Sequence, residues 1–589
     1  MVHRILRTFF AQGVIDNPPP GTLDVPSQDV PGGVVPAYML DDGAELSREI
    51  AAKGTVLLKN DHRALPLSPR DSVALIGPDA DRYIDMFGSP SVPNPGRLTT
   101  IVDGVTDRSR ADVTYVPGGD TTRYGDTLGG PAPIPSGVLT PAGGEPGEQG
   151  VRASYFYGFQ GDDPQNPGEV RTEDQVNHRT GNGGLIGTFG LNPSPAPLIP
   201  VDYVTQPMTA LYETTLTPVR TGYYQLGVRG MGTFKLTVNG RTLVDRDQVG
   251  LNNYLRPIRL VAGREYDLRL SYQDDTPGQC CSDELPGPTV RLAWKPPAAN
   301  ASPQIAAAVR AAREADVAVV VASTLEGEAA DLHSLQLPQD QDRLIRAVSR
   351  ANPNTVVVLS TGGPVLTPWL DQVDGVLEAW FPGEEQGRAV ADVLYGDVNP
   401  GGKLPVTFPA TESQPEQIGI ENPSLEFNVQ YPTTTFNEGI GVGYRGYDAR
   451  HLRPGFPFGH GLSYTTFKYE KLQVRSPHGN SDGRVSVRVR NTGDRTGTEV
   501  VQVYHGQLPT RASTPPKQLA GWARVTLDPG ERKTVRIAID PGESDRVMSY
   551  WRVEDNRLGG RWVTPSGPVP IYVGSSSRDI RLTGRMMLD

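Results

Sequence analysis

The sequence is poor in cysteine, with only Cys280 and Cys281, which are neighbours in the chain. A conventional disulfide framework is therefore excluded. Adjacent Cα atoms lie about 3.8 Å apart, closer than the usual separation across a disulfide, so we expect two free thiols. The eight histidines show none of the spacings that are typical of zinc sites. The sequence thus indicates neither a metal nor another cofactor.

Long apolar runs are also lacking, and none approaches the ~20 residues that a membrane-spanning helix needs. The first 20 residues have no continuous apolar segment followed by a small-residue cleavage site, so we predict no signal peptide. A cytoplasmic location is the default expectation, or secretion if the true N-terminus lies upstream. The formal net charge of −11, without a block of Lys and Arg, argues against nucleic acid as a partner.

Glycine and proline are abundant, at 67 and 55 of 589 residues, which predicts several domains with many turns and short strands. Short β-branched apolar runs occur at residues 72–76, 315–323, 354–362 and 373–380, and helical patterns such as 341–352 lie between them. Alternation of buried strands with helices is typical of a parallel sheet covered on both faces. We therefore predict an α/β layer that is split into two stretches of sequence.

Between these two stretches, alternating strands such as 222–230 and 266–272 predict an inserted β-sandwich. Further alternating strands, such as 483–491, predict a second all-β unit at the C-terminus. The predicted fold is multidomain: an α/β sandwich interrupted by a β-sandwich and followed by an immunoglobulin-like β-sandwich. The predicted segments are a helix and linker (1–40), the first α/β part (41–147), the insert (148–297), the second α/β part (298–409), an irregular linker (410–462) and the C-terminal domain (463–589).

Four motifs carry a family resemblance. The segment WFPGEEQGRAVADVLYGDVNPGGKLPVTFP at 380–409, with AAKGTVLLKN at 51–60, EGIGVGYRGYD at 438–448 and FPFGHGLSYTTF at 456–467, resembles family 3 glycoside hydrolases. The tail, including residues 517–535, resembles the fibronectin type III-like domain of that family. The insert resembles the protective-antigen-like domain that a subset of its β-glucosidases carries.

The resemblance also has a consequence for the nucleophile. Residues 1–16 resemble the last helix of the (β/α)₈ barrel that precedes the α/β domain in this family, and that barrel carries the catalytic Asp nucleophile. No residue of this sequence matches that role. The resemblance therefore implies part of a retaining β-glycosidase that acts on terminal β-linked glucose-like or xylose-like residues, with a barrel-bearing partner chain or a further N-terminal domain. It implies no cofactor, no nucleic acid and no membrane.

The second carboxyl group is expected within residues 322–345, where a strand end is followed by a polar loop and a helix. Retaining glycosidases need two carboxyl groups about 5–5.5 Å apart. Alignment with the Glu-x-Glu-Gly-x-Asp-Arg run of insert-containing relatives gives Glu328 the acid/base position. Glu326 is the alternative, and Asp331 is a weaker candidate for positioning the loop.

Two departures from the family pattern and two other functions stay open. Ala329 stands where the family commonly has Gly, and Leu332 stands where Arg is common. Without the motif, both glutamates would read as ordinary solvated loop charges. The chain is alternatively a non-catalytic carbohydrate-binding or scaffold protein, or a truncated gene product that is inactive alone.

Three tryptophans that could stack on sugars, Trp369, Trp380 and Trp522, are expected in the core.

Overall fold

The computed structural model describes most of the chain, and all structural statements below concern the described part. It comprises residues 37–83, 98–145, 147–161, 164–179, 199, 207–274, 288–297, 302–326, 332–419, 436–478, 482–539, 546–553 and 560–588. The chain forms two compact units, residues 1–46 and 47–589, and the features below belong to the second, except that α2 begins in the first. The predicted helix at 1–16 and the pair Cys280 and Cys281 lie outside the described residues.

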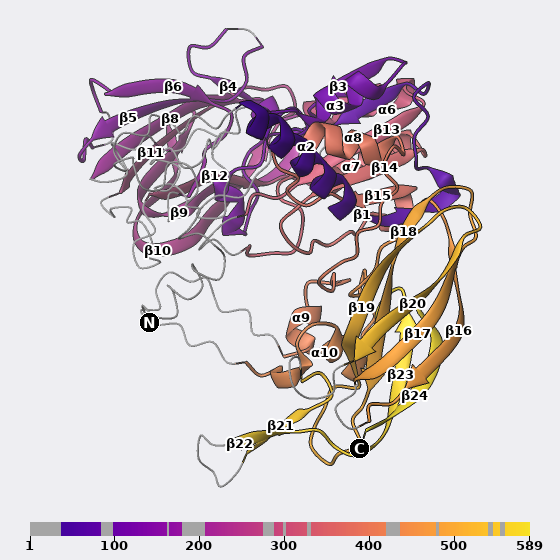
Figure 1. Ribbon diagram of the computed structural model, residues 1–589. Coiled ribbons are helices and arrows are strands. Elements are labelled where there is room, and N and C mark those ends of the chain that lie inside the picture. Colours follow the sequence, from indigo (N-terminus) through magenta and orange to yellow (C-terminus); the bar gives the residue numbers. More distant parts are fainter. Residues whose placement is uncertain are drawn as a thin grey trace, which may run out of the picture. The chain divides into compact units, whose positions relative to one another are not determined.

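A six-stranded sheet with the order β1-β15-β14-β13-β2-β3 forms the α/β domain (Figure 1). Five strands are parallel and β1 pairs antiparallel at one edge. The segments predicted as buried parallel strands are confirmed: every residue of β2, β13, β14 and β15 is buried. The strands are β1 (Val56–Asn60), β2 (Val73–Ile76), β3 (Val113–Val116), β13 (Val317–Ser323), β14 (Thr355–Ser360) and β15 (Gly375–Glu378).

Helices cover both faces of this sheet, which is why its strands read as continuous apolar runs. Alternate residues of β2 belong to two separate cores: Val73 and Leu75 pack with α3 and α8, whereas Ala74 and Ile76 pack with α6 and α7. The helices are α2 (Ala37–Gly54), α3 (Ile101–Arg108), α6 (Pro303–Glu314), α7 (Gln341–Ala351) and α8 (Gln386–Leu394), with short turns η1 (Asp61–Arg63), η2 (Tyr124–Leu128), η3 (Ser136–Val138) and η4 (Leu370–Gln372).

The insert is one nine-stranded antiparallel sheet with the path β6-β5-β8-β11-β9-β12-β7, to which β10 and β4 add by pairing with β9 and β8 (Figure 1). A single aromatic-rich core lies against it and includes Tyr155, Tyr212, Phe234 and Trp294. The strands are β4 (Leu139–Pro141), β5 (Val151–Tyr157), β6 (Glu169–Glu173), β7 (Asn177–Arg179), β8 (Met208–Leu216), β9 (Gly222–Val238), β10 (Arg241–Leu260), β11 (Tyr266–Asp274) and β12 (Thr289–Lys295).

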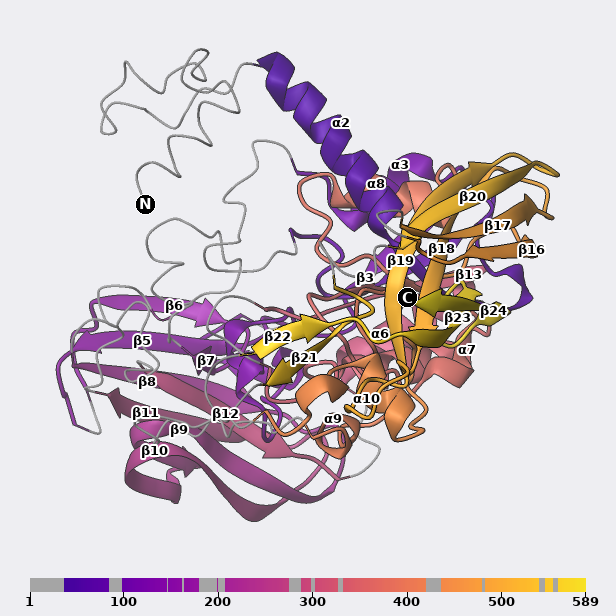
Figure 2. The same ribbon diagram turned by 60° about the horizontal axis from the view of Figure 1, so that its bottom comes forward.

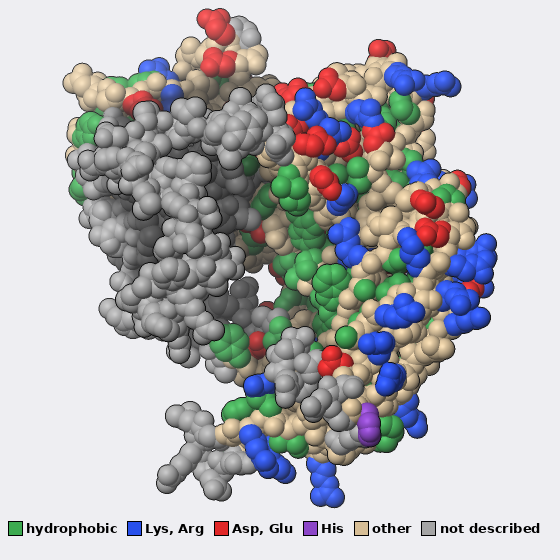
Figure 3. Space-filling view, in the orientation of Figure 1, with side chains coloured by type: hydrophobic (Ala, Val, Ile, Leu, Met, Phe, Trp, Pro, Cys, Tyr) green, Lys and Arg blue, Asp and Glu red, His purple; other side chains and the backbone are tan. Residues whose placement is uncertain are grey.

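The C-terminal domain is a β-sandwich, as predicted, with sheets β16-β17-β20 and β19-β18-β23-β24 (Figure 2). Figure 3 shows Lys and Arg side chains gathered on its surface. The strands are β16 (Phe467–Arg475), β17 (Gly483–Asn491), β18 (Gly497–Gly506), β19 (Lys517–Leu527), β20 (Arg532–Ile539), β23 (Gly567–Gly574) and β24 (Ile580–Leu588), with a hairpin of β21 (Tyr550–Val553) and β22 (Gly560–Val563). The segment before it holds α9 (Gln414–Gln417), η5 (Gly439–Gly441) and α10 (Tyr444–Ala449).

The expectation for the three tryptophans holds for two of them. Trp369 is fully buried and Trp380 packs against the α/β core. Trp522 is 60% exposed, so its assignment to the core is wrong. Side chains alternate along a strand, and the core residues Val525 and Leu527 occupy the opposite face of β19. No helix among the described residues is long and apolar enough to cross a membrane.

Candidate active site

Polar side chains gather where the buried strands of the six-stranded sheet end. The parallel strands bring their carboxyl ends to one edge, where α/β folds place chemistry. The residues that end or directly follow β2, β13, β14 and β15 are here called the polar edge: Asp79, Ser323, Glu326, Thr361 and Glu378. Each of them is joined to a neighbouring strand end or loop by hydrogen bonds.

Asp79 fastens the end of β13 to the loop that follows β2. Its carboxylate is fully buried. It accepts hydrogen bonds from the Ser323 hydroxyl and from the Thr122 backbone N–H at 3.2 Å, and it pairs with Arg82 at 2.6 Å. A buried carboxylate needs partners of this kind to stay charged. Asp79 therefore has a structural role at the base of the edge.

Glu326 joins the loop after β13 to the loop after β14. Its Oε1 accepts hydrogen bonds from Thr324 Oγ1 at 2.6 Å and from the Gly362 N–H at 3.1 Å. A side chain at position 362 would clash, because its Cβ would lie 2.4 Å from Glu326 Oε2. The close approach of this carboxylate thus requires glycine. Through Oε1, Glu326 links these two loops.

Glu378 ends β15 and is fully buried. Its Oε1 accepts a hydrogen bond from the Trp380 N–H at 2.9 Å, and the Trp380 carbonyl accepts one from Ser360 Oγ at 2.7 Å. Trp380 has φ +60°, in the left-handed region that bulky residues seldom adopt. Such backbone strain costs about 1–3 kcal/mol and persists only where neighbours enforce it. The two hydrogen bonds supply that enforcement.

Burial favours the protonated form of Glu378. Thr361 Oγ1 lies 3.1 Å from Glu378 Oε2 and 2.8 Å from the Gly363 carbonyl oxygen. The Thr361 hydroxyl is within donating distance of both acceptors, and its single hydrogen serves one of them at a time. Burial raises the pKa of Glu378 well above its ordinary value, the hydrogen bonds from Trp380 and Thr361 oppose that shift, and the charge of Glu326 adds to it.

A cavity of about 510 Å³ opens beside the end of β13. Its walls include Thr324 and Leu325, which directly follow β13, and Leu332 and His333, which lie beyond the next few residues of the chain. Glu412, on another wall, accepts hydrogen bonds from the Leu335 N–H at 2.9 Å and from Ser334 Oγ at 3.2 Å. Residues 327–331 therefore connect two segments that both line this cavity.

The insert contributes a further wall through Arg291 on β12. This guanidinium is buried and donates to the carbonyl oxygens of Gly125 at 2.5 Å, Pro131 at 2.8 Å and Gly129 at 3.0 Å. Burial lowers the pKa of Arg291 to about 10. Arg291 thereby fixes the loop between the α/β layer and the insert, and that loop faces the cavity.

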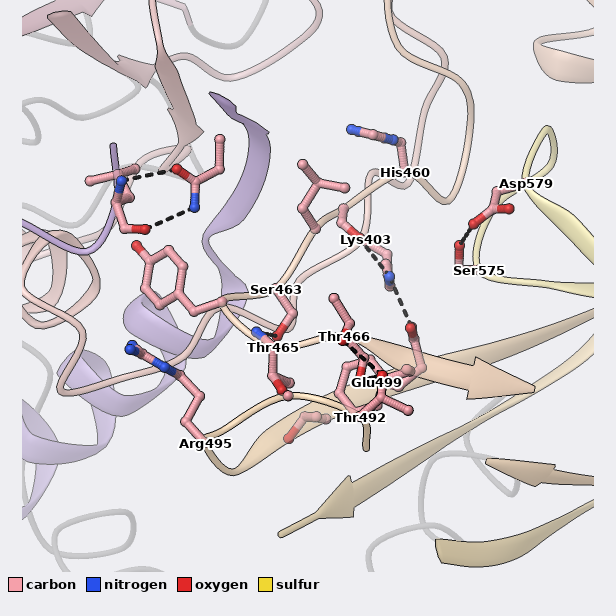
Figure 4. A pocket seen from close by; sticks show the side chains of 18 of the residues that line it. Lys403, His460, Ser463, Thr465, Thr466, Thr492, Arg495, Glu499, Ser575 and Asp579 are labelled. Carbon is pink, nitrogen blue, oxygen red and sulfur yellow. Dashed lines mark hydrogen bonds and ion pairs between the residues drawn. The ribbon is translucent and has the colours of Figure 1, made fainter. Parts of the chain in front are cut away.

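A larger cavity of about 1150 Å³ lies between the loop around His460 and strands of the C-terminal domain (Figure 4). Two ion pairs lie in its lining: Lys403 pairs with Glu499 at 2.9 Å, and Arg581 pairs with Asp579 at 2.7 Å. Lys403 also donates to the Gly461 carbonyl oxygen at 2.7 Å. The Lys403–Glu499 pair joins the two domains, whereas the Arg581–Asp579 pair lies within the C-terminal domain. We place the candidate site at the polar edge instead.

Comparison with known proteins decides the family. Residues 55–464 match the glycosyl hydrolase family 3 C-terminal domain, and residues 499–577 match the fibronectin type III-like domain. The chain belongs to glycosyl hydrolase family 3.

Family 3 β-glucosidases are similar along most of the chain. The sequence is 32% identical over 557 residues to a beta-glucosidase of Kluyveromyces marxianus and 33% identical over 566 residues to one of Rhizobium radiobacter. The structure is similar to that of DesR, a beta-glucosidase from Streptomyces venezuelae in complex with D-glucose, with 30% identity, a TM-score of 0.63, and coverage of 99% of this chain and 63% of that one. The two sequence matches cover 91% and 92% of this chain, but only 61% and 62% of those proteins.

The family assignment bears on the residues predicted from the sequence. Of the three, the structure describes Glu326, at the polar edge; Glu328 and Asp331 lie outside the described residues, so their roles stay predictions. The described residues on either side of them line the 510 Å³ cavity or belong to the polar edge. In the described part of the chain, no group of three His, Cys, Asp or Glu side chains is arranged to hold a metal ion.

Sequence reasoning missed several residues that shape this family 3 site, above all Glu378, Gly362 and Arg291. One signal was present for Glu378, because a single acidic residue ends the apolar run at 375–378. No local signal marks Gly362 or Arg291. Their roles depend on atoms that are distant in the sequence.

Proposed function

We propose that this chain supplies the acid/base part of a retaining β-glucosidase, with Glu328 as the acid/base residue. One observation carries the proposal. In this family 3 chain, Glu328 lies in sequence between Leu325 and Leu332, and both of these residues line the 510 Å³ cavity at the carboxyl end of β13. A sugar oxygen in that cavity would lie next to the strand ends where α/β folds perform chemistry. The similar proteins are named beta-glucosidases, and two of their structures are complexes with glucose.

The mechanism requires a second carboxyl group. In a retaining glycosidase, one carboxylate attacks the anomeric carbon while the acid protonates the leaving oxygen, and the same residue then acts as a base toward water. We propose that the nucleophile is an Asp from polypeptide beyond these 589 residues, since the chain spans about 60% of the length of its relatives. Glucose-like β-glycosides are the proposed substrates.

The contacts of Glu326 favour Glu328 as the acid. Glu326 Oε1 accepts two hydrogen bonds that fix the adjacent loops, and Glu326 lies near the buried Glu378. An acid/base residue must exchange its proton freely within reach of the leaving oxygen. We therefore propose that Glu326 positions the loop and that Glu328 transfers the proton.

A reconstitution assay tests the proposal. The chain is mixed with a protein that consists of the barrel domain of a relative, and release of 4-nitrophenol from its β-glucoside is followed. We expect little turnover from either protein alone, and both complex formation and hydrolysis from the mixture. Absence of a complex together with absence of a rate gain would refute the proposal.

Two matched variants then separate the glutamates. Glu328→Gln should lower the rate on poorly activated glucosides by about 10²–10⁴-fold, the usual contribution of general acid–base catalysis. With a well-activated leaving group, added azide should restore turnover and give β-glucosyl azide, because azide needs no base to attack the glycosyl-enzyme. Glu326→Gln should show no such rescue. Azide rescue of Glu326→Gln, and not of Glu328→Gln, would transfer the acid/base role to Glu326.

A further inference from the structure

The outward face of sheet β16-β17-β20 in the C-terminal domain is strongly basic. Inward-facing residues of this sheet, such as Val485, Val487 and Ile537, are buried in the core of the sandwich. The outward side chains alternate with them and are exposed or half-buried. Seven of these are cationic and are here called the basic face: Lys468, Arg475, Arg484, Arg488, Arg490, Arg532 and Arg536.

The strand register sets like charges opposite one another. Arg475 pairs with Arg484, and Arg490 lies between Lys468 on one side and Arg532 on the other. Side chains directly opposite in an antiparallel sheet have Cβ atoms about 4.5–5.5 Å apart, and like charges in that position are destabilising. A fold would be more stable without these rows. Their presence points to a ligand that neutralises them.

Little within the protein neutralises this charge. Glu470 is the acidic residue on the same face; Lys468 pairs with it at 3.2 Å, and the bond to Lys468 together with the nearby charges of Arg488 and Arg532 lowers the pKa of Glu470. Among the described residues, none of the six arginines of the basic face has an ion-pair partner within 4.0 Å. These cations therefore remain available to an external anion.

The basic face also contrasts with the chain as a whole, whose formal net charge is −11. Figure 3 shows Lys and Arg side chains gathered over the C-terminal domain. Arginine presents a planar fork of N–H donors that matches carboxylates in bidentate fashion. From Arg484 to Arg490 the row on β17 is about 20 Å long, at ~3.3 Å per residue. That length suits several repeating units of a linear polymer.

We propose that the basic face binds a linear acidic polysaccharide through the carboxylates of its uronic acid units. The face carries no aromatic side chain on which nucleic acid bases could stack. It also exposes no large apolar side chain that could insert among lipids. A polyuronate needs neither feature, only a flat row of cations. This surface would hold the glycosidase on charged polysaccharide, independently of the chemistry assigned to Glu328.

Titration calorimetry of the full chain with polygalacturonate tests the proposal, and fully methyl-esterified polygalacturonate is the neutral control with the same backbone. We expect binding of the acid form that weakens steeply with added salt, and none of the ester. The variant with Arg484→Gln, Arg488→Gln and Arg490→Gln should bind at least about tenfold more weakly. Equal binding of the ester would overturn the proposal, as would absence of binding to polygalacturonate at low salt.

A charge-matched control removes three exposed arginines from α6 and α7, with Arg310→Gln, Arg313→Gln and Arg350→Gln. It should bind like the unmodified chain, and an equal loss in this control would refute the assignment to the basic face. Thermal melting should show the β17 variant at least as stable as the parent, because opposed like charges are removed. If that variant unfolds, Lys468→Gln with Arg475→Gln on β16 repeats the test. Tighter binding of duplex DNA or of anionic vesicles than of polygalacturonate would also overturn the proposal.

Discussion

Glu378→Gln should stabilise the α/β domain in a pH-dependent manner. Glutamine is neutral at every pH and matches the uncharged form of Glu378 that burial favours, and its amide oxygen accepts the hydrogen bond from the Trp380 N–H. The wild-type carboxyl ionises in the unfolded chain above pH ~4.5 but stays neutral while buried. The folded state then binds more protons than the unfolded state, so the wild type loses stability as the pH rises.

The magnitude follows from proton linkage. One proton retained on folding lowers the free energy of unfolding by roughly 1.4 kcal/mol per pH unit, starting near the unfolded pKa and continuing until the buried carboxyl ionises. The glutamine variant lacks this dependence. Its advantage over wild type should therefore be small near pH 4.5 and should grow to about 2–3 kcal/mol two units higher.

Urea unfolding at a series of pH values from 4.5 to 8, followed by tryptophan fluorescence, measures this difference. Glu378→Leu is the matched control, because it removes the titrating group but leaves the part-buried Trp380 N–H without its acceptor. That variant should be destabilised by about 1–3 kcal/mol at pH 4.5, where the wild-type carboxyl is only about half-ionised in the unfolded chain. A constant difference between wild type and Glu378→Gln across the whole range would refute the proton assigned to Glu378.

Three further predictions concern the packing around the site. Burial raises the pKa of Asp342 to about 6, although a hydrogen bond from Trp369 Nε1 at 2.8 Å opposes the shift. The free energy of unfolding of Asp342→Asn should therefore gain about 1–3 kcal/mol over that of the wild type as the pH rises from 4 to 6, and no more above pH 6. Urea titrations measure this difference, and a difference that keeps growing to pH 8 would contradict the prediction. Lys403→Ala leaves the buried Glu499 without its ion-pair partner and should lower the free energy of unfolding by about 3–5 kcal/mol, as chemical unfolding measures. Replacing both residues by apolar residues of similar volume should restore most of that stability. Burial raises the pKa of Glu173, but its charged and hydrogen-bonding neighbours outweigh burial and lower that pKa to about 2. The stability that Glu173 gives the insert should therefore disappear as the pH falls from 4.5 to 2. A flat circular dichroism profile of the wild-type chain over that window, or an identical profile for Glu173→Gln, would argue against this prediction.

The α/β layer was predictable because buried parallel strands and their helices leave a strong local pattern. The β-branched runs at 315–323 and 354–362 became β13 and β14, and 341–352 became α7 to within one residue. Trp522 was not predictable in the same way. Hydrophobic character alone does not tell which face of a two-sided strand meets the core, and in β19 the inner face belongs to Val525 and Leu527.

The candidate site was likewise predictable from the sequence only where its signal is local. The sequence motif singled out the loop with Glu326, since a glutamate after a buried strand lies at the functional edge of a parallel sheet. The partners of Glu326 lie elsewhere in the chain: Gly362 follows β14, and the nearby Glu378 ends β15. A hydrogen bond between residues 36 positions apart leaves no trace in either local segment.

The sequence by itself determined the family, the α/β and β domains, and the place of the loop that carries Glu326 and Glu328, because motifs and side-chain periodicity are local properties. Only the tertiary structure decided that the pKa of Glu378 is raised, since that depends on burial. It also decided where charge accumulates. The sequence contains no block of Lys and Arg. Antiparallel pairing of β16, β17 and β20 nevertheless brings seven cationic side chains from residues 468–536 onto one face. The reason is that the strand register, and not the distance along the sequence, decides which side chains are neighbours.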